Sequence, residues 1–153
     1  MLAKKTDPLS LCFSEPECHG TTIRYMEVFR FEGGSAERLI PWGGKLYNCG
    51  LLKICGGMSS GYAEYVLPDT REYADLVRWA SIFSRLKGLT VADAMHCVEQ
   101  NRTEWGIHRA MLAEAALTDL AAHIRRRDER RHLGGIPLER SFLMDYSRAY
   151  YTF

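Results

Sequence analysis

The first half of the chain alternates between apolar and polar residues in the manner of β-strands. Residues 22–31 (TIRYMEVFRF) place two sets of side chains on opposite sides of a strand: Ile23, Tyr25, Glu27, Phe29 and Phe31 on one, and Arg24, Met26, Val28 and Arg30 on the other. A second strand over residues 45–55 is interrupted at Gly50, and a third over residues 61–67 ends at Pro68. The short glycine turn between the second and third strands predicts an antiparallel meander.

After the third strand, apolar residues recur at the spacing of helices. Asp69 or Thr70 is expected to cap a first helix, which ends at Gly88. Thr90 opens a second helix, TVADAMHCVEQ, with Asp93 three residues after the cap in an arrangement similar to a capping box. The pattern therefore predicts two helices joined by a short turn.

A third helix is rich in alanine. It is expected to start near residue 103, to contain AMLAEAALTDLAAH (residues 110–123) and to run into the basic segment RRRDERRH. Because the side chains on its apolar face are small, we expect this helix to approach its neighbours closely. Residues 147–153 (SRAYYTF) then form a strand at the end of the sequence.

The order of these elements predicts an α+β fold. Strands followed by helices favour a three-stranded antiparallel meander with a three-helix bundle on one face, plus an extra strand at the C-terminus. Residues 1–21 show no periodicity and are expected to be a flexible lead-in, residues 22–132 the main domain, and residues 133–153 a connector and the last strand.

Composition adds few constraints on function. The chain has 153 residues, is 46% hydrophobic and 25% charged, and carries a net charge of +1, which gives it no strong attraction to nucleic acids or membranes. No apolar run is long enough for a signal peptide or a membrane span, so a cytoplasmic protein is expected. Its five cysteines include no CxxC pair, and Cys12, Cys18 and His19 lack a fourth ligand, so free thiols and no metal site are predicted.

Three segments, taken in order, resemble the N-terminal capping domain of the enolase superfamily, in the mandelate racemase and muconate-lactonizing group. Residues 61–64 (GYAE) are similar to the family's G-x-G-E segment, although Ala63 replaces the second glycine. Residues 110–123 resemble its A-x-x-A-x-E-x-A-L-x-D-L-A-G-K helix, and residues 135–138 (GIPL) its G-x-P-L connector. Within the helix the matching residues are Glu114, Ala116, Leu117, Asp119, Leu120 and Ala121, whereas Ala122 and His123 stand where Gly-Lys is usual.

The resemblance implies a lid over a (β/α)-barrel. In such enzymes a base removes a proton next to a carboxylate and Mg²⁺ stabilises the enediolate. The lysine pair, the metal ligands and the base lie on later barrel strands, and this sequence contains no K-x-K. We therefore predict no catalytic residue, no metal ligand and no cofactor in this chain, which is expected to be a truncated or split form in which residues 22–132 are the capping domain and residues 147–153 the first barrel-like strand.

The resemblance also implies which side chains would face a substrate. Two cap loops, here residues 32–44 and about 65–69, close over the barrel mouth in this family. The candidates are then Arg38, Trp42 and Tyr65. Trp42 offers a large rigid surface, and the guanidinium of Arg38 can donate two parallel hydrogen bonds to a carboxylate. The alternatives are that Trp42 packs into the domain's own core and that Arg38 is a solvated loop residue.

The acidic residues of the matching segments are expected to be structural. Glu64 is predicted to be partly buried and paired with an arginine or a backbone amide. Glu114 and Asp119 are five residues apart and do not share a helical face, so they are not predicted to act as a catalytic pair and should bond to amides or to barrel residues.

Three kinds of partner follow from these hypotheses. A cap without its barrel exposes apolar surface, so self-association or pairing with a separate barrel chain is expected, with a small carboxylate bound only when the barrel is supplied. The arginines of residues 125–131 suit the negative end of a helix dipole, and nucleic-acid binding through them is the least favoured hypothesis.

Overall fold

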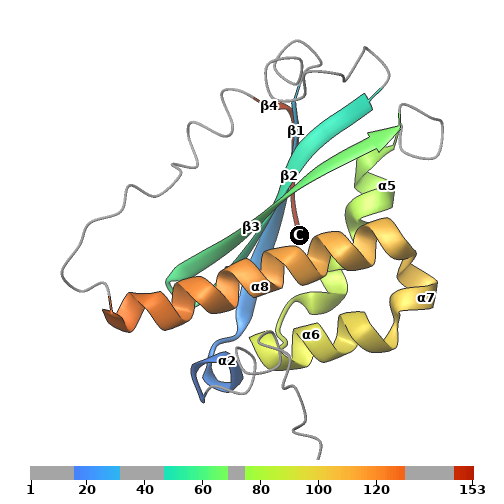
Figure 1. Cartoon of the computed structure of the whole chain (residues 1–153). Coiled ribbons are helices and arrows are strands. Elements are labelled where there is room, and N and C mark those ends of the chain that lie inside the picture. Colours follow the sequence, from blue (N-terminus) through green and yellow to red (C-terminus); the bar gives the residue numbers. More distant parts are fainter. Residues whose placement is uncertain (1–15, 32–46, 69–74, 130–146) are drawn as a thin grey trace, which may run out of the picture.

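An antiparallel sheet with helices against one face makes up the described part of the chain (Figure 1). This computed structural model describes residues 16–31, 47–68, 75–129 and 147–153. The strand order is β3-β2-β1-β4, and helices follow the first three strands along the chain. The predicted α+β class, the meander and the extra C-terminal strand are therefore confirmed.

The first three strands form the meander and the fourth joins its other edge. Their bounds are Ile23–Phe31 for β1, Tyr47–Gly56 for β2, Ser59–Pro68 for β3 and Ser147–Thr152 for β4. β1 pairs antiparallel with both β2 and β4, and Gly57 makes the β2–β3 turn with a φ of 57°, a value that glycine adopts without strain. In this chain, residues 147–152 thus extend the sheet of the first three strands.

Six helical segments accompany the sheet in the described ranges of the chain. They are α2 (Pro16–Gly20), α5 (Leu76–Ala80), the 3₁₀ segment η1 (Ser81–Leu86), α6 (Val91–Gln100), α7 (Arg102–Trp105) and α8 (Ile107–Glu129). The short helix α2 lies within the segment expected to be a lead-in, and its Cys18 is buried. Residues 1–15 lie outside the described residues.

The helix ends match the sequence predictions in part. Thr90 caps α6 by accepting the amide proton of Asp93 at 3.1 Å, as predicted. Asp75 caps α5 by accepting the amide proton of Arg78 at 3.0 Å, while the predicted caps at residues 69 and 70 lie outside the described residues. The prediction of one continuous third helix was wrong, because the chain bends at Gly106, where φ is 79°, and so separates α7 from α8.

The main core lies between the sheet and the helices. Register places alternate residues of the strands on the helix-facing side. The large buried side chains there include Met26, Val28, Leu52 and Ile54 from the sheet and Phe83, Trp105, Leu117 and Leu120 from the helices. Burial of this apolar surface supplies most of the folding free energy.

Helix α8 approaches β3 most closely at Gly61. A Cβ atom at that position would lie 2.1 Å from the carbonyl oxygen of Ala116 and 2.3 Å from the amide nitrogen of Leu120, so only glycine fits there. Beside this contact, the amide of Tyr62 donates a hydrogen bond of 2.9 Å to Oδ2 of Asp119. We call these five residues the β3–α8 junction; it joins two of the three segments that resemble the capping domain.

Candidate functional site

The three predicted substrate-facing residues are not brought together in the described structure. Arg38 and Trp42 lie outside the described residues. Tyr65 lies within β3, and only 6% of its surface is exposed. Its hydroxyl donates a hydrogen bond of 2.9 Å to the carbonyl oxygen of Phe29, and its ring packs against Trp79 with the centroids 5.6 Å apart. Tyr65 is therefore a core residue, and contacts within the domain engage both its hydroxyl and its ring.

Gly50 makes room for the Tyr65 ring. A Cβ atom at residue 50 would lie 2.3 Å from the tyrosine hydroxyl and 2.0 Å from the carbonyl oxygen of Phe29. The glycine that interrupts the second strand pattern is therefore a packing requirement of the core.

The acidic residues of the resembling segments have different surroundings. Glu64 is exposed, so the prediction of a partly buried acid was wrong; register places it opposite Leu51, on the sheet face that points away from the helices. Asp119 accepts the Tyr62 amide, so the predicted bond to an amide is confirmed for it, whereas Glu114 forms an ion pair with the Arg102 side chain instead.

The second face of the sheet carries a polar row that the sequence analysis did not foresee. Register places Tyr62, Lys53, Glu27 and Thr152 side by side across β3, β2, β1 and β4. Glu27 is fully buried and Lys53 is 6% exposed. Lys53 Nζ donates to Oε2 of Glu27 at 2.9 Å, and the Tyr150 hydroxyl donates to Oε1 at 2.9 Å. We call Glu27, Lys53 and Tyr150 the sheet ion-pair cluster.

The cluster shifts the protonation of its members. Burial lowers the pKa of Lys53, but the hydrogen bond from Lys53 to Glu27 and the charges of Cys55 and Glu27 outweigh it, so the pKa lies above its usual value. Burial raises the pKa of the Tyr62 hydroxyl above its usual value. Lys53 therefore stays a cation in the folded protein, and Glu27 faces a permanent positive charge.

The geometry of this cluster indicates a structural role. Both carboxylate oxygens of Glu27 accept hydrogen bonds, so neither is poised to take a proton from a substrate. The cluster instead ties β4 to β1 and β2 across 123 residues of sequence. The signal that would have found it is a charged residue flanked on both sides by apolar residues, Glu27 within YMEVF and Lys53 within LLKIC.

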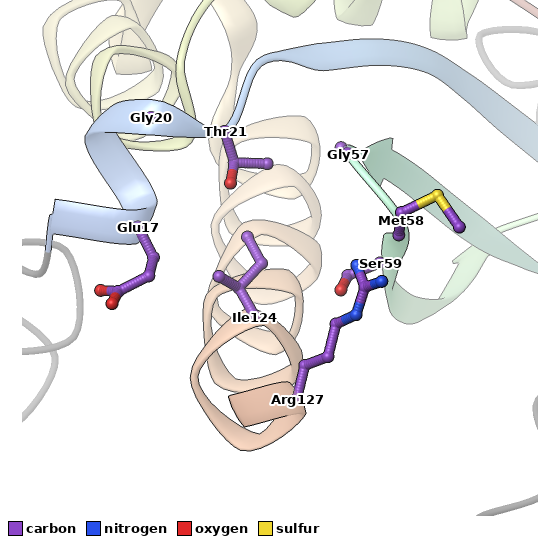
Figure 2. A pocket seen from close by; sticks show the side chains of 9 residues that line it. Glu17, Gly20, Thr21, Gly57, Met58, Ser59, Ile124 and Arg127 are labelled. Atoms are coloured by element: carbon purple, nitrogen blue, oxygen red, sulfur yellow. The ribbon is translucent and has the colours of Figure 1, made fainter. Parts of the chain in front are cut away.

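A hollow of about 590 Å³ lies where the sheet, α2 and α8 meet (Figure 2). Its lining comes from α2, from the β2–β3 turn and from the last turns of α8, and it includes Glu17, Thr21, Met58, Ser59, Ile124 and Arg127. The volume is in the range of small-molecule sites. The sequence did not predict this hollow, because its walls come from three segments that are far apart in the sequence.

Metal-ligating side chains do not gather in the described structure. Among the described residues, no group of three or more His, Cys, Asp or Glu side chains is arranged to hold a metal ion. The cysteines at positions 18, 49, 55 and 97 are free thiols. Cys55 Sγ lies 3.2 Å from the hydroxyl of Ser60, and burial raises the pKa of the Cys49 thiol.

Comparison with known proteins leaves the family of the chain open. The chain matches no family model, no curated protein and no solved structure. None of the helices in the described ranges combines the length and apolar character needed to cross a membrane. The chemistry of the described residues and the resemblance stated above therefore carry the functional inference.

Replacing Tyr65 by phenylalanine tests the core role of this residue. Burial raises the pKa of the Tyr65 hydroxyl well above its usual value of about 10. A folded-state pKa above the unfolded-state value contributes stability that is present below about pH 10 and is lost as the pH rises further. The Tyr65→Phe variant should lose about 1–3 kcal/mol at pH 7, because the Phe29 carbonyl oxygen loses its side-chain donor, and should lose less additional stability than wild type above pH 10.

Urea unfolding followed by circular dichroism at pH 7, 9 and 11 measures both effects. Equal alkaline slopes for the variant and the wild type would show that Tyr65 titrates in the folded state as it does in the unfolded chain, contrary to its described burial.

Proposed function

We propose that this chain is a capping domain similar to those of enolase-superfamily racemases, epimerases and cycloisomerases. In this role it is the lid that excludes water and contacts the variable part of a small carboxylate. Mg²⁺, its ligands and the base belong to a (β/α)-barrel, on the same or on another polypeptide. No residue of the chain is assigned a catalytic or metal-binding role.

The observation that carries the proposal is the β3–α8 junction. Residues 61–64 and 110–123 were matched to the family separately, yet they form one contact in space through Gly61, Tyr62 and Asp119. A small residue on the strand, small residues on the helix and an acid aimed at the strand amide are the parts that this contact requires. The shared geometry supports treating the two matches as one feature.

The fold supports the same role. The three meander strands precede helices α5 to α8, which is the order expected for the cap, while the short helix α2 comes before them. Arg38 and Trp42 remain the candidates for substrate contact, while Tyr65 is excluded from that role because its ring and hydroxyl are engaged in the core.

The test combines the purified chain with a separate barrel. The barrel is a mandelate racemase-group enzyme from which its own cap has been deleted, and proton NMR in D₂O follows exchange of the α-proton of a 2-hydroxy carboxylate in the presence of Mg²⁺. We expect no exchange from the chain alone, binding of the chain to the barrel, and faster exchange by the mixture than by the barrel. Arg38→Ala and Trp42→Ala variants should slow only the mixture.

Two results would overturn the proposal. The first is Mg²⁺-dependent exchange catalysed by the chain alone. The second is failure of the folded chain to bind the barrel in sedimentation experiments.

A stand-alone interaction module is the second candidate function. It is favoured by two large apolar side chains one turn apart on α8, Ile107 and Met111, which are 61% and 55% exposed. In this case the partner is a second copy of the chain. Sedimentation over a range of concentrations should then show a dimer that an Ile107→Lys, Met111→Lys variant cannot form, whereas a monomer at all concentrations would remove this candidate.

A further inference from the structure

The hollow between α2, the β2–β3 turn and α8 has one charged side chain of each sign on its walls. In Figure 2 the Arg127 side chain reaches toward Met58 and Ser59 on one side, and the Glu17 carboxylate stands on the other. The side chains of Thr21 and Ile124 lie between them. The cavity therefore offers a cation, an apolar middle and an anion, in that order.

Neither charged group has a partner within the described residues. The side chains of Glu17 and Arg127 make no hydrogen bond or ion pair there, although other exposed charges, such as Arg85 and Glu104, pair with each other. Glu17 belongs to α2 and Arg127 to α8, so the fold holds them on separate walls. Both are thus available to a ligand that enters from solvent.

We propose that this hollow binds a small zwitterion whose ammonium and carboxylate groups stand at opposite ends of an apolar chain. Arg127 receives the carboxylate through its planar pair of donors, with the Ser59 hydroxyl beside it, and Glu17 receives the ammonium. The apolar chain packs on Ile124 and Met58. This site is separate from the β3–α8 junction and does not depend on the capping role.

The two charges decide between classes of ligand. A phosphate or another compact dianion would meet Arg127 but has no cationic group for Glu17 and would be repelled by its carboxylate. An ordinary α-amino acid carries its two charges on adjacent groups, whereas Glu17 and Arg127 belong to different helices and stand on separate walls. Separation of the charges is therefore the feature that the cavity selects.

The glycines of the turn give the cavity its shape. A Cβ atom on Gly56 would lie 3.1 Å from the methyl carbon of Thr21, and one on Gly57 would lie 3.4 Å from the same atom. Gly57 also has a positive φ of 57°. These residues let the turn approach Thr21 and form one wall without filling the hollow.

The test uses three probes. 6-Aminohexanoate carries both charged groups, hexanoate lacks the ammonium group, and hexylamine lacks the carboxylate. Binding to the full chain is measured by NMR titration at low salt, which reports both affinity and the residues that respond. We expect 6-aminohexanoate to bind at least about fivefold more tightly than either single-charge probe, with the largest shifts at residues 57–59 and 124–127.

Two variants separate the contributions. Glu17→Gln should abolish the preference for 6-aminohexanoate over hexanoate, and Arg127→Gln should abolish the preference over hexylamine. Arg126→Gln removes a neighbouring exposed charge that does not line the hollow and should leave all three affinities unchanged.

Equal affinity for the three probes, or shifts confined to residues outside the hollow, would overturn the proposal. The same holds if the preferences survive both substitutions. Failure here leaves the capping proposal intact, because the barrel experiment does not involve these residues.

Discussion

A Gly61→Ala variant should lose about 3 kcal/mol of folding stability, at the upper end of the usual cost of overpacking. The added methyl group would lie 2.1 Å from the carbonyl oxygen of Ala116 and 2.3 Å from the amide nitrogen of Leu120. These are backbone atoms of a regular helix and cannot rotate away as a side chain would. The helix must therefore move off β3, which opens the core at Leu120 and lengthens the Tyr62–Asp119 hydrogen bond. Urea unfolding followed by circular dichroism measures the loss.

Gly20→Ala is the matched control for this substitution. No atom lies within 4 Å of a Cβ built on Gly20, so the same chemical change should alter stability by less than about 0.5 kcal/mol. If Gly61→Ala is as mild as the control, α8 does not contact β3 as closely as described. The proposed function would then lose the observation that carries it.

Replacing Lys53 by methionine should cost about 3–5 kcal/mol, because it leaves the carboxylate of Glu27 buried without its cation. The double variant Glu27→Gln, Lys53→Met should recover most of that loss. Glutamine is neutral and keeps an oxygen that accepts the hydrogen bond from the Tyr150 hydroxyl, while methionine fills the volume of the lysine stem. The expected result is a double variant that is more stable than the Lys53→Met single variant.

A double-mutant cycle at pH 7 measures this coupling directly. The exposed ion pair Arg85–Glu104 provides the control, since neutralising it should change stability by less than about 1 kcal/mol. If Lys53→Met costs no more than this surface pair and the second substitution restores nothing, then Glu27 and Lys53 are solvated, contrary to their described burial.

Local patterns predicted the elements of this fold because those patterns depend on neighbours in sequence. Alternation in TIRYMEVFRF predicted β1, and the Thr90 cap predicted the start of α6. The bend at Gly106 was missed because a single glycine within an otherwise helical pattern does not indicate whether its φ is positive. The change to a 3₁₀ segment after Ala80 was missed for a similar reason: its side chains fit either helix type.

Site residues were harder to predict because their surroundings depend on register and on contacts between distant segments. Glu27 stood on the same predicted strand side as three aromatic residues, but its partner Lys53 could be assigned only once β1 and β2 were aligned. The resemblance placed Tyr65 in a loop. In the structure its buried ring occupies space that Gly50, on the neighbouring strand β2, leaves free. The hollow beside Arg127 has no local signature at all.

The amide of Tyr62 offers the most direct test of the account, because it reports the β3–α8 junction at a single atom. β3 is an edge strand of the sheet. A backbone amide of β3 that points away from β2 therefore has a hydrogen-bond acceptor only where another element supplies one. Asp119 supplies it, and hydrogen exchange measured by NMR should find the Tyr62 amide protected in the wild type and rapidly exchanging in an Asp119→Ala variant that remains folded. Rapid exchange in the wild type, or protection that survives the loss of Asp119, would contradict the junction and with it the central support for a capping domain.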